Sequence, residues 1–170
     1  TAGDFSRLTL SRIEHSGLWV GTGLYLGAAL YGLDDDRRKG VPFQGEPRRP
    51  YRMIVLDPDR SQLYENLNLR VDQMIERGAM EEAKQILRML LEGELQEANP
   101  ILKAIGLQHL LKHLRGEMNF ERTIEVWKRD TRRLAKRQWT WLRKFAPPSS
   151  SCLWLSENSP RQAIEFFDKA

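Results

Sequence analysis

The chain has 170 residues, of which 41% are hydrophobic and 29% are charged, and its formal net charge is +4. This length suits one domain, or one domain with an appendage, and the apolar content excludes global disorder. The longest apolar run, residues 24–33, is interrupted by two glycines and is too short to cross a membrane. The single cysteine, Cys152, excludes an intrachain disulfide and a cysteine metal cluster, so we expect a reducing, cytoplasmic setting.

The first third of the chain has the pattern of an α/β unit. Residues 4–15 show helical spacing of apolar positions and begin without an initiator Met, so we expect the natural N-terminus to lie upstream. An apolar run at residues 18–20, a Gly-Thr-Gly turn and a helix over residues 24–30 follow in the order strand, turn, helix. Residues 34–50 contain three prolines and two glycines without periodicity, which predicts a linker.

From residue 51 onward the sequence predicts one strand and then mainly helices. Residues 52–56 form a buried-strand candidate that Asp57-Pro58 ends, and Asp59 can cap a helix over residues 60–77. The side chains expected to face inward from that helix are Leu63, Leu67, Val71, Met74 and Ile75. The remaining predictions are helices over 80–91, 101–114 and 120–145, a strand over 153–155, and a last helix over 159–170.

The predicted helix over residues 120–145 separates its side chains into two faces. At about 100° per residue its apolar residues fall within an arc of roughly 100°, and most of its cations fall opposite. Residues 122–144 hold nine basic and two acidic residues, so a net charge of +7 lies here and −3 on the rest of the chain. Such a row of cations suits RNA or DNA. The alternatives are a solvated helix face and an anionic membrane surface, the latter disfavoured because the apolar face carries core-type aromatics.

Four segments resemble, in order, motifs of the tRNA dimethylallyltransferases. Residues 131–143 read Thr-Arg-Arg-Leu-Ala-Lys-Arg-Gln-Trp-Thr-Trp-Leu-Arg, which looks like the TRxxAKRQxTWxR signature of that family. Three shorter segments look like its GGTGLY…LLxGL, DR..LY..I..RVD.M and AIGY…GE motifs, and they lie at residues 21–33, 60–74 and 104–117. Each short segment alone is weak, but four in order cover nearly the whole chain outside residues 34–50.

This resemblance implies an enzyme that uses Mg²⁺ and transfers a dimethylallyl group from dimethylallyl diphosphate to N6 of the adenosine adjacent to the tRNA anticodon. The implied fold is α/β, with a P-loop NTPase-like core only partly present and a predominantly helical C-terminal portion. Residues 1–33 would be a remnant of the catalytic core, 34–50 a linker replacing a tRNA-gripping insertion, and 51–170 a strand plus the mainly helical part of the core, including the basic helix 120–145. We expect tRNA and dimethylallyl diphosphate as partners, no membrane, a monomer and a cytoplasmic location.

The resemblance also implies site residues. Thr22 matches the family Thr that donates to the oxygen between phosphate and allyl carbon, and Arg70 matches the Arg that contacts the diphosphate. Gly21 and Gly23 would let the backbone approach the diphosphate. The matching tRNA-contacting positions are Lys103, Arg132, Lys136, Arg137, Gln138 and Arg143. The alternatives are a helix cap for Thr22 and an ordinary exposed helix arginine for Arg70.

Part of the family pattern is absent from this sequence. It contains no GxxxxGK[ST] phosphate loop and no Asp-Ser-x-Gln segment with the general-base Asp, so we expect this chain alone to be inactive. Leu107 and His109 stand where the family has an aromatic and an acidic residue. His109 and His113 lack the Glu of an HExxH motif, so no metal site is expected. Two other functions stay open: a non-catalytic helical RNA-binding module and an adenylate isopentenyltransferase.

Overall fold

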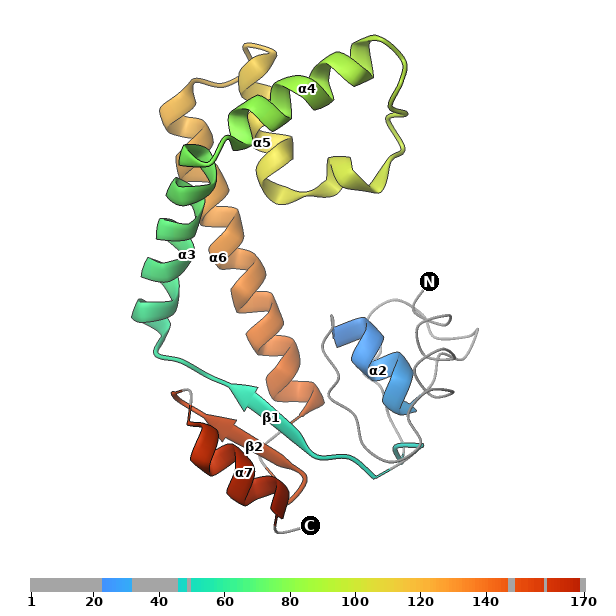
Figure 1. Ribbon diagram of the computed structural model, residues 1–170, viewed down its shortest axis with the longest axis vertical. Helices are drawn as coiled ribbons and strands as arrows, with labels where there is room; N and C mark the ends of the chain where they lie inside the picture. Colours follow the sequence, from blue (N-terminus) through green and yellow to red (C-terminus); the bar gives the residue numbers. More distant parts are fainter. Residues whose placement is uncertain (1–22, 32–45, 49, 147–148, 158, 169–170) are drawn as a thin grey trace. The chain divides into compact units, whose positions relative to one another are not determined.

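The structure, a computed structural model, describes residues 23–31, 46–48, 50–146, 149–157 and 159–168. Over these residues it is mostly helical, with one small sheet (Figure 1). The elements are α2 Gly23–Tyr31, β1 Met53–Leu56, α3 Arg60–Glu76, α4 Ala79–Leu91, a 3-10 helix Pro100–Lys103, α5 Ile105–Leu114, α6 Phe120–Phe145, β2 Cys152–Leu155 and α7 Pro160–Asp168. The predicted helix over 4–15 and strand over 18–20 lie outside the described residues, as does most of the predicted linker.

The chain divides into two compact units, and the boundary falls within α6. Unit 1 comprises residues 1–57 and 138–170, and unit 2 comprises residues 58–137. The boundary predicted between residues 33 and 34 lies outside the described residues. Within the residues that the structure describes, no helix combines the length and apolarity that crossing a bilayer requires.

Unit 1 contains a parallel pair of strands. β1 and β2 lie side by side in register, with Met53 opposite Cys152 and Leu56 opposite Leu155 (Figure 1). Their apolar sequences, without alternation, are typical of parallel strands with covered faces. Val55 and Cys152 form a buried cluster with Ala146, which follows α6. The predicted strands at 52–56 and 153–155 are therefore confirmed.

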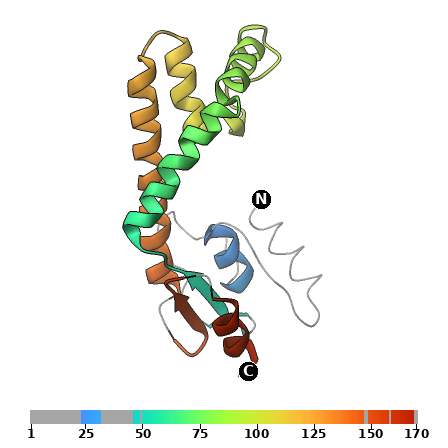
Figure 2. The same ribbon diagram turned by 60° about the vertical axis from the view of Figure 1, so that its left-hand side comes forward.

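Two helices complete unit 1. α7 lies beside the sheet in both views, and the Arg52 guanidinium, just before β1, donates to the backbone carbonyl of Phe166 in α7 (Figures 1 and 2). α2 buries Ala28 and Ala29, and Tyr31 at its end meets Phe145 edge to face, with ring centroids 5.7 Å apart. Both helices confirm their predicted positions.

Unit 2 begins with a helix whose start is set by a side-chain cap. Asp59 Oδ1 accepts hydrogen bonds from the backbone N–H groups of Ser61 at 2.9 Å and Gln62 at 3.1 Å. The Ser61 hydroxyl also donates to this carboxylate, and these bonds hold the pKa of Asp59 below its usual value. α3 turns into α4 at Gly78, whose φ of 102° is accessible mainly to glycine.

The core of unit 2 brings four elements onto one tryptophan. Val71 of α3, Ala83 of α4, Leu110 of α5 and Trp127 of α6 are each at most 3% exposed and form one cluster. Gly106 permits the close approach of α5 to α6, because a Cβ atom there would lie 2.2 Å from Cζ2 of Trp127. The Ala-Ile-Gly segment at residues 104–106 thus has a packing role in this chain.

Two expectations for unit 2 were wrong. The helix predicted over 101–114 is interrupted, because Ala104 is extended with φ −62° and ψ 128° between the 3-10 helix and α5. Met74, expected to face inward, is 41% exposed. At about 100° per residue Met74 lies about 100° around α3 from Ile75, which packs on the core, so Met74 falls beyond the edge of the packed stripe.

Candidate nucleic-acid interface

α6 is anchored in unit 2 by its first two turns. The Asn119 side chain caps the helix by accepting from the backbone N–H of Arg122 at 2.8 Å, and Thr123 Oγ1 donates to the Asn119 carbonyl at 2.8 Å. Thr123, Val126 and Trp127 are buried. Because this face is used for packing, the cations from residue 128 onward project from the rest of the helix circumference.

Two polar contacts align α6 with α3 inside unit 2. Lys128 Nζ lies 2.6 Å from Asp72 Oδ1, and Arg132 Nη1 donates to Asn68 Oδ1 at 2.5 Å. The pairs are one helical turn apart and run in opposite directions along the two helices, so α3 and α6 are antiparallel here (Figure 2). The charge of Lys128 is balanced by Asp72, whereas Arg132 is bonded to a neutral amide.

Asp130 gathers three donors in unit 2. Its carboxylate lies 3.0 Å from Arg129 Nε, 3.2 Å from Arg133 Nη1 and 3.2 Å from His109 Nε2. The hydrogen bond from Arg129 is the main reason that the pKa of Asp130 is lowered, so the carboxyl is ionised at neutral pH. One carboxylate therefore balances part of the charge of two neighbouring arginines.

His109 is a buried partner of this carboxylate. Burial lowers the pKa of its imidazole and outweighs the opposite influence of Asp130. A neutral ring that donates Nε2–H to Asp130 leaves Nδ1 buried, and Nδ1 has no hydrogen-bond partner among the described residues. His113, one turn further, instead bonds through Nδ1 to the Met118 carbonyl at 2.9 Å. The two histidines thus have separate structural partners.

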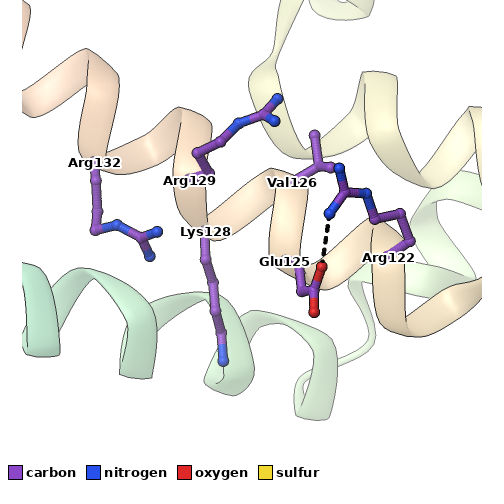
Figure 3. A pocket seen from close by; sticks show the side chains of 6 residues that line it. All are labelled: Arg122, Glu125, Val126, Lys128, Arg129 and Arg132. Carbon is purple, nitrogen blue, oxygen red and sulfur yellow. Dashed lines mark hydrogen bonds and ion pairs between the residues drawn. The ribbon is translucent and has the colours of Figure 1, made fainter.

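A shallow pocket lies on α6 among the cations of unit 2 (Figure 3). Its lining residues are Arg122, Glu125, Val126, Lys128, Arg129 and Arg132. Glu125 accepts from Arg122 at 2.9 Å, and Lys128 and Arg129 point to opposite sides of the helix (Figure 3). Arg122, Lys128 and Arg129 each have a carboxylate partner, so Arg132, bonded to the neutral amide of Asn68, is the lining cation whose charge is left for an anion.

The last turns of α6 lie in unit 1, where Arg143 is held between two indole rings. Its guanidinium carbon is 4.3 Å from the ring centroid of Trp139 and 4.9 Å from that of Trp154. Asp57, directly after β1, accepts from Arg143 Nη2 at 3.0 Å and from the indole N–H of Trp139 at 2.5 Å. Arg143 is therefore fixed by a carboxylate and two aromatic faces, although its side chain remains 49% exposed.

The predicted site residues fall into different environments. Gly21 and Thr22 lie outside the described residues, and Gly23 is the first residue of α2. Arg70 on α3 and Lys103 at the end of the 3-10 helix are exposed, and neither has a hydrogen bond or ion pair within the described part of the chain. Lys136, Arg137 and Gln138 are exposed on α6, whereas Arg132 and Arg143 make the contacts described above. α6 thus brings together five of the six predicted tRNA-contacting residues, and their roles remain predictions.

Two carboxylates and an indole were missed by sequence reasoning. Asp130 was signalled by its i, i+3 spacing to Arg133 on a helix, and Trp139 by its i, i+4 spacing to Arg143. Asp57 had no local signal, because its partner Arg143 is 86 residues away. The sequence indicated only that Asp57 ends a strand.

A family model described as IPP transferase matches residues 36–145 of this chain. Curated proteins similar to it include two tRNA dimethylallyltransferases. That of Clostridioides difficile (strain 630) is 43% identical over 93 residues, which are 55% of this chain and 29% of that protein. That of Mesorhizobium japonicum is 38% identical over 126 residues, which are 71% of this chain and 38% of that protein. The chain thus spans about a third of the length of these relatives.

Two solved structures share the fold. One is a tRNA isopentenylpyrophosphate transferase from Bacillus halodurans, with a TM-score of 0.65, 24% identity, and coverage of 88% of this chain and 63% of that one. The other is a tRNA delta(2)-isopentenylpyrophosphate transferase from Staphylococcus epidermidis, with a TM-score of 0.62, 18% identity, and coverage of 88% and 66%.

Proposed function

The chain belongs to the IPP transferase family, and we propose that it is the largely helical, tRNA-facing part of an enzyme that transfers a dimethylallyl group to N6 of the adenosine adjacent to the tRNA anticodon. The observation that best supports this proposal is α6, which carries the family signature at residues 131–143 and a row of exposed cations. The donor in this proposal is dimethylallyl diphosphate. The protein would act as a monomer in the cytoplasm.

We propose that the sheet of unit 1 continues beyond β1 and β2. Among the described residues the sheet has two strands, and a parallel pair alone is unusual, because parallel sheets normally have both faces covered and several strands. We therefore infer that β1 and β2 belong to a P-loop NTPase-like sheet, of which this sequence contains only a part. The phosphate loop of such a sheet has no counterpart in the 170 residues.

The proposed reaction gives the residues of this chain two tasks. N6 attacks the allylic carbon, the bond from that carbon to the diphosphate oxygen breaks, and the N6 proton passes to a base. The Asp-Ser-x-Gln segment expected to supply that base is absent from these 170 residues. Thr22 would donate to the departing oxygen, and Arg70 would hold the diphosphate in two places. Gly21 and Gly23 would keep the turn close to the diphosphate. The α6 cations would bind the tRNA backbone.

The Mg²⁺ implied by the resemblance has no built site among the residues described. No three histidine, cysteine or acidic side chains come together there in a way that could hold a metal ion. Mg²⁺ often binds proteins through one or two carboxylates together with substrate phosphates. When bound in this way, Mg²⁺ would neutralise part of the charge on the diphosphate.

A transfer assay tests the activity. The protein, expressed from its complete reading frame, would be incubated with labelled dimethylallyl diphosphate, Mg²⁺ and unmodified tRNA, and the nucleosides analysed by mass spectrometry. We expect label on N6 of the adenosine next to the anticodon. Label on free AMP alone would establish the adenylate isopentenyltransferase instead. Tight tRNA binding without any transfer would establish the non-catalytic RNA-binding module.

The salt dependence of tRNA binding tests the role of α6. Replacing Lys136 and Arg137 together by Gln should weaken binding and reduce the slope of log K against log salt by about two units, because two phosphate contacts are lost. The matched control replaces Lys84 and Arg161, two exposed cations paired with glutamates on α4 and α7. The same loss in both double variants would mean that net charge, and not the α6 surface, attracts the RNA.

A further inference from the structure

Trp139 is an exposed indole within the signature helix. Of the tryptophans that the structure describes, Trp127 is 3% exposed, Trp141 and Trp154 are half-buried, and Trp139 is the most exposed, at 42%. A tryptophan ring normally contributes to stability by burying a large apolar area. An indole left at the surface does not make that contribution in full, so its placement calls for another explanation.

The orientation of this ring is fixed by unit 1. Its N–H donates to Asp57 at 2.5 Å, so the polar edge of the indole is satisfied. The Arg143 guanidinium lies over one face, 4.3 Å from the ring centroid. No second ring or cation of the described chain faces the indole. The ring is thus held with one face covered by a cation and with substantial exposed area, which lowers the entropy that a ligand must overcome on stacking.

The basic residues near the ring favour a ligand that carries phosphate. Residues 131–144 contain six basic and no acidic residues, namely Arg132, Arg133, Lys136, Arg137, Arg143 and Lys144. Arg137 and Lys144 are exposed and have no hydrogen bond or ion pair within the described part of the chain. On α6, Trp139 lies about 40° from Arg143 at about 100° per residue, so the ring belongs to the cationic side. A flat aromatic face among cations is the arrangement that binds single-stranded nucleic acid.

We propose that the face of the Trp139 ring opposite Arg143 is a stacking platform for an unpaired base of the RNA substrate. This inference rests on the proposed tRNA-binding function and adds a base contact to it. Arg143 lies on the covered face of the ring and contributes a cation–π contact there, so that guanidinium, indole and base form one stack. Asp57 is the positioning residue, because it holds both the indole N–H and the guanidinium.

The test compares two substitutions against two RNA ligands. Trp139→Leu removes the aromatic face but keeps an apolar residue that favours a helix, whereas Trp139→Phe keeps an aromatic face and loses the bond to Asp57. The ligands are a tRNA anticodon stem-loop and a fully paired duplex of equal length. Ile164→Ala, at another exposed apolar position of unit 1, is the control. Circular dichroism verifies that each variant is folded.

We expect Trp139→Leu to weaken stem-loop binding about 5- to 150-fold, with an unchanged salt slope, because stacking on one base is lost and no charge is removed. Trp139→Phe should retain most of the affinity, and duplex binding should be the same in all variants. Unchanged stem-loop affinity in Trp139→Leu, or an equal loss for the duplex, would overturn the stacking role while leaving tRNA binding in place. If the protein with Trp139 unchanged bound neither RNA, the proposed function would be overturned as well.

A second measurement does not depend on the stability of Trp139→Leu. In protein labelled with 5-fluorotryptophan, the ¹⁹F resonance of Trp139 is the one missing from Trp139→Phe. Adding the stem-loop should shift this resonance more than the others. A Trp139 resonance that is shielded from solvent in the free protein and unmoved by RNA would show that another part of the protein covers the ring, and the proposal would fall.

Discussion

Replacing Gly106 by Ala should destabilise unit 2, although the same change in most helices is stabilising. In an exposed helix interior, Ala is favoured over Gly by about 1 kcal/mol. Here the new Cβ would lie 2.2 Å from Trp127 Cζ2, whereas carbon atoms pack best at about 3.5–4.0 Å. The ring or the helix must therefore move by more than about 1 Å in a close-packed core. Overpacking of this kind costs about 1–3 kcal/mol, so after subtracting the gain in helix propensity we expect a net loss of up to about 2 kcal/mol.

Urea unfolding followed by far-ultraviolet circular dichroism measures this loss. Trp127→Leu removes the ring that the new methyl group would strike, so in that background Gly106→Ala should be neutral or stabilising. The double-mutant cycle should then give a coupling energy of at least about 1 kcal/mol between the two positions. A single Gly106→Ala variant about 1 kcal/mol more stable than the native chain would refute the close approach of α5 and α6, because the gain in helix propensity would then appear without a packing cost. So would additivity of the two substitutions.

Two further predictions concern charged side chains. Burial lowers the pKa of His109 below its usual value near 6.5, so below that pH the unfolded chain binds a proton that the folded chain does not. The free energy of unfolding should therefore be greatest above about pH 6.5 and fall as the pH drops below it, and His109→Gln should flatten this dependence in urea titrations. An identical pH profile in the variant would contradict the buried neutral imidazole. The second prediction is Arg70→Lys, assayed in the protein from its complete reading frame. The specificity constant for dimethylallyl diphosphate should fall roughly 10- to 150-fold, because an ammonium group cannot bind two oxygens as a guanidinium does. The affinity for tRNA should stay nearly intact. Loss of tRNA affinity with normal use of the diphosphate would place Arg70 on the RNA surface.

The helices with strong local signals were predictable from the sequence. Asp59 caps α3 as expected, and α6 has its predicted bounds, Phe120–Phe145, because apolar periodicity and the Pro-Pro pair after it act within a few residues. The break at Ala104 was not predictable, since neither proline nor glycine stands there and the interruption comes with tertiary packing. Local signals thus locate elements better than they locate interruptions.

The candidate interface was predictable only in part. The cationic face of α6 followed from helical periodicity, but how its charges are paired did not. Asp72 and Asp57 lie 56 and 86 residues from the cations that they bind, and such distances in sequence leave no local pattern. Arg143 in particular was expected as an RNA contact and is held by Asp57 and two indoles in unit 1. The contact of Arg143 with RNA remains a prediction.

The parallel pairing of β1 and β2 has a consequence for the order of folding. The 95 residues between these strands include all of unit 2, so unit 1 is assembled from two separated stretches of chain. During synthesis β1 emerges early and must wait for β2, whereas unit 2 is continuous and has all its residues before β2 is made. Closing an unstructured loop becomes costlier as it lengthens, by about 0.6 kcal/mol per doubling, so a folded unit 2 would make the late closure easier. Until then β1 presents an unpaired apolar edge, and nascent chains stalled before residue 152 should be the species most prone to aggregate.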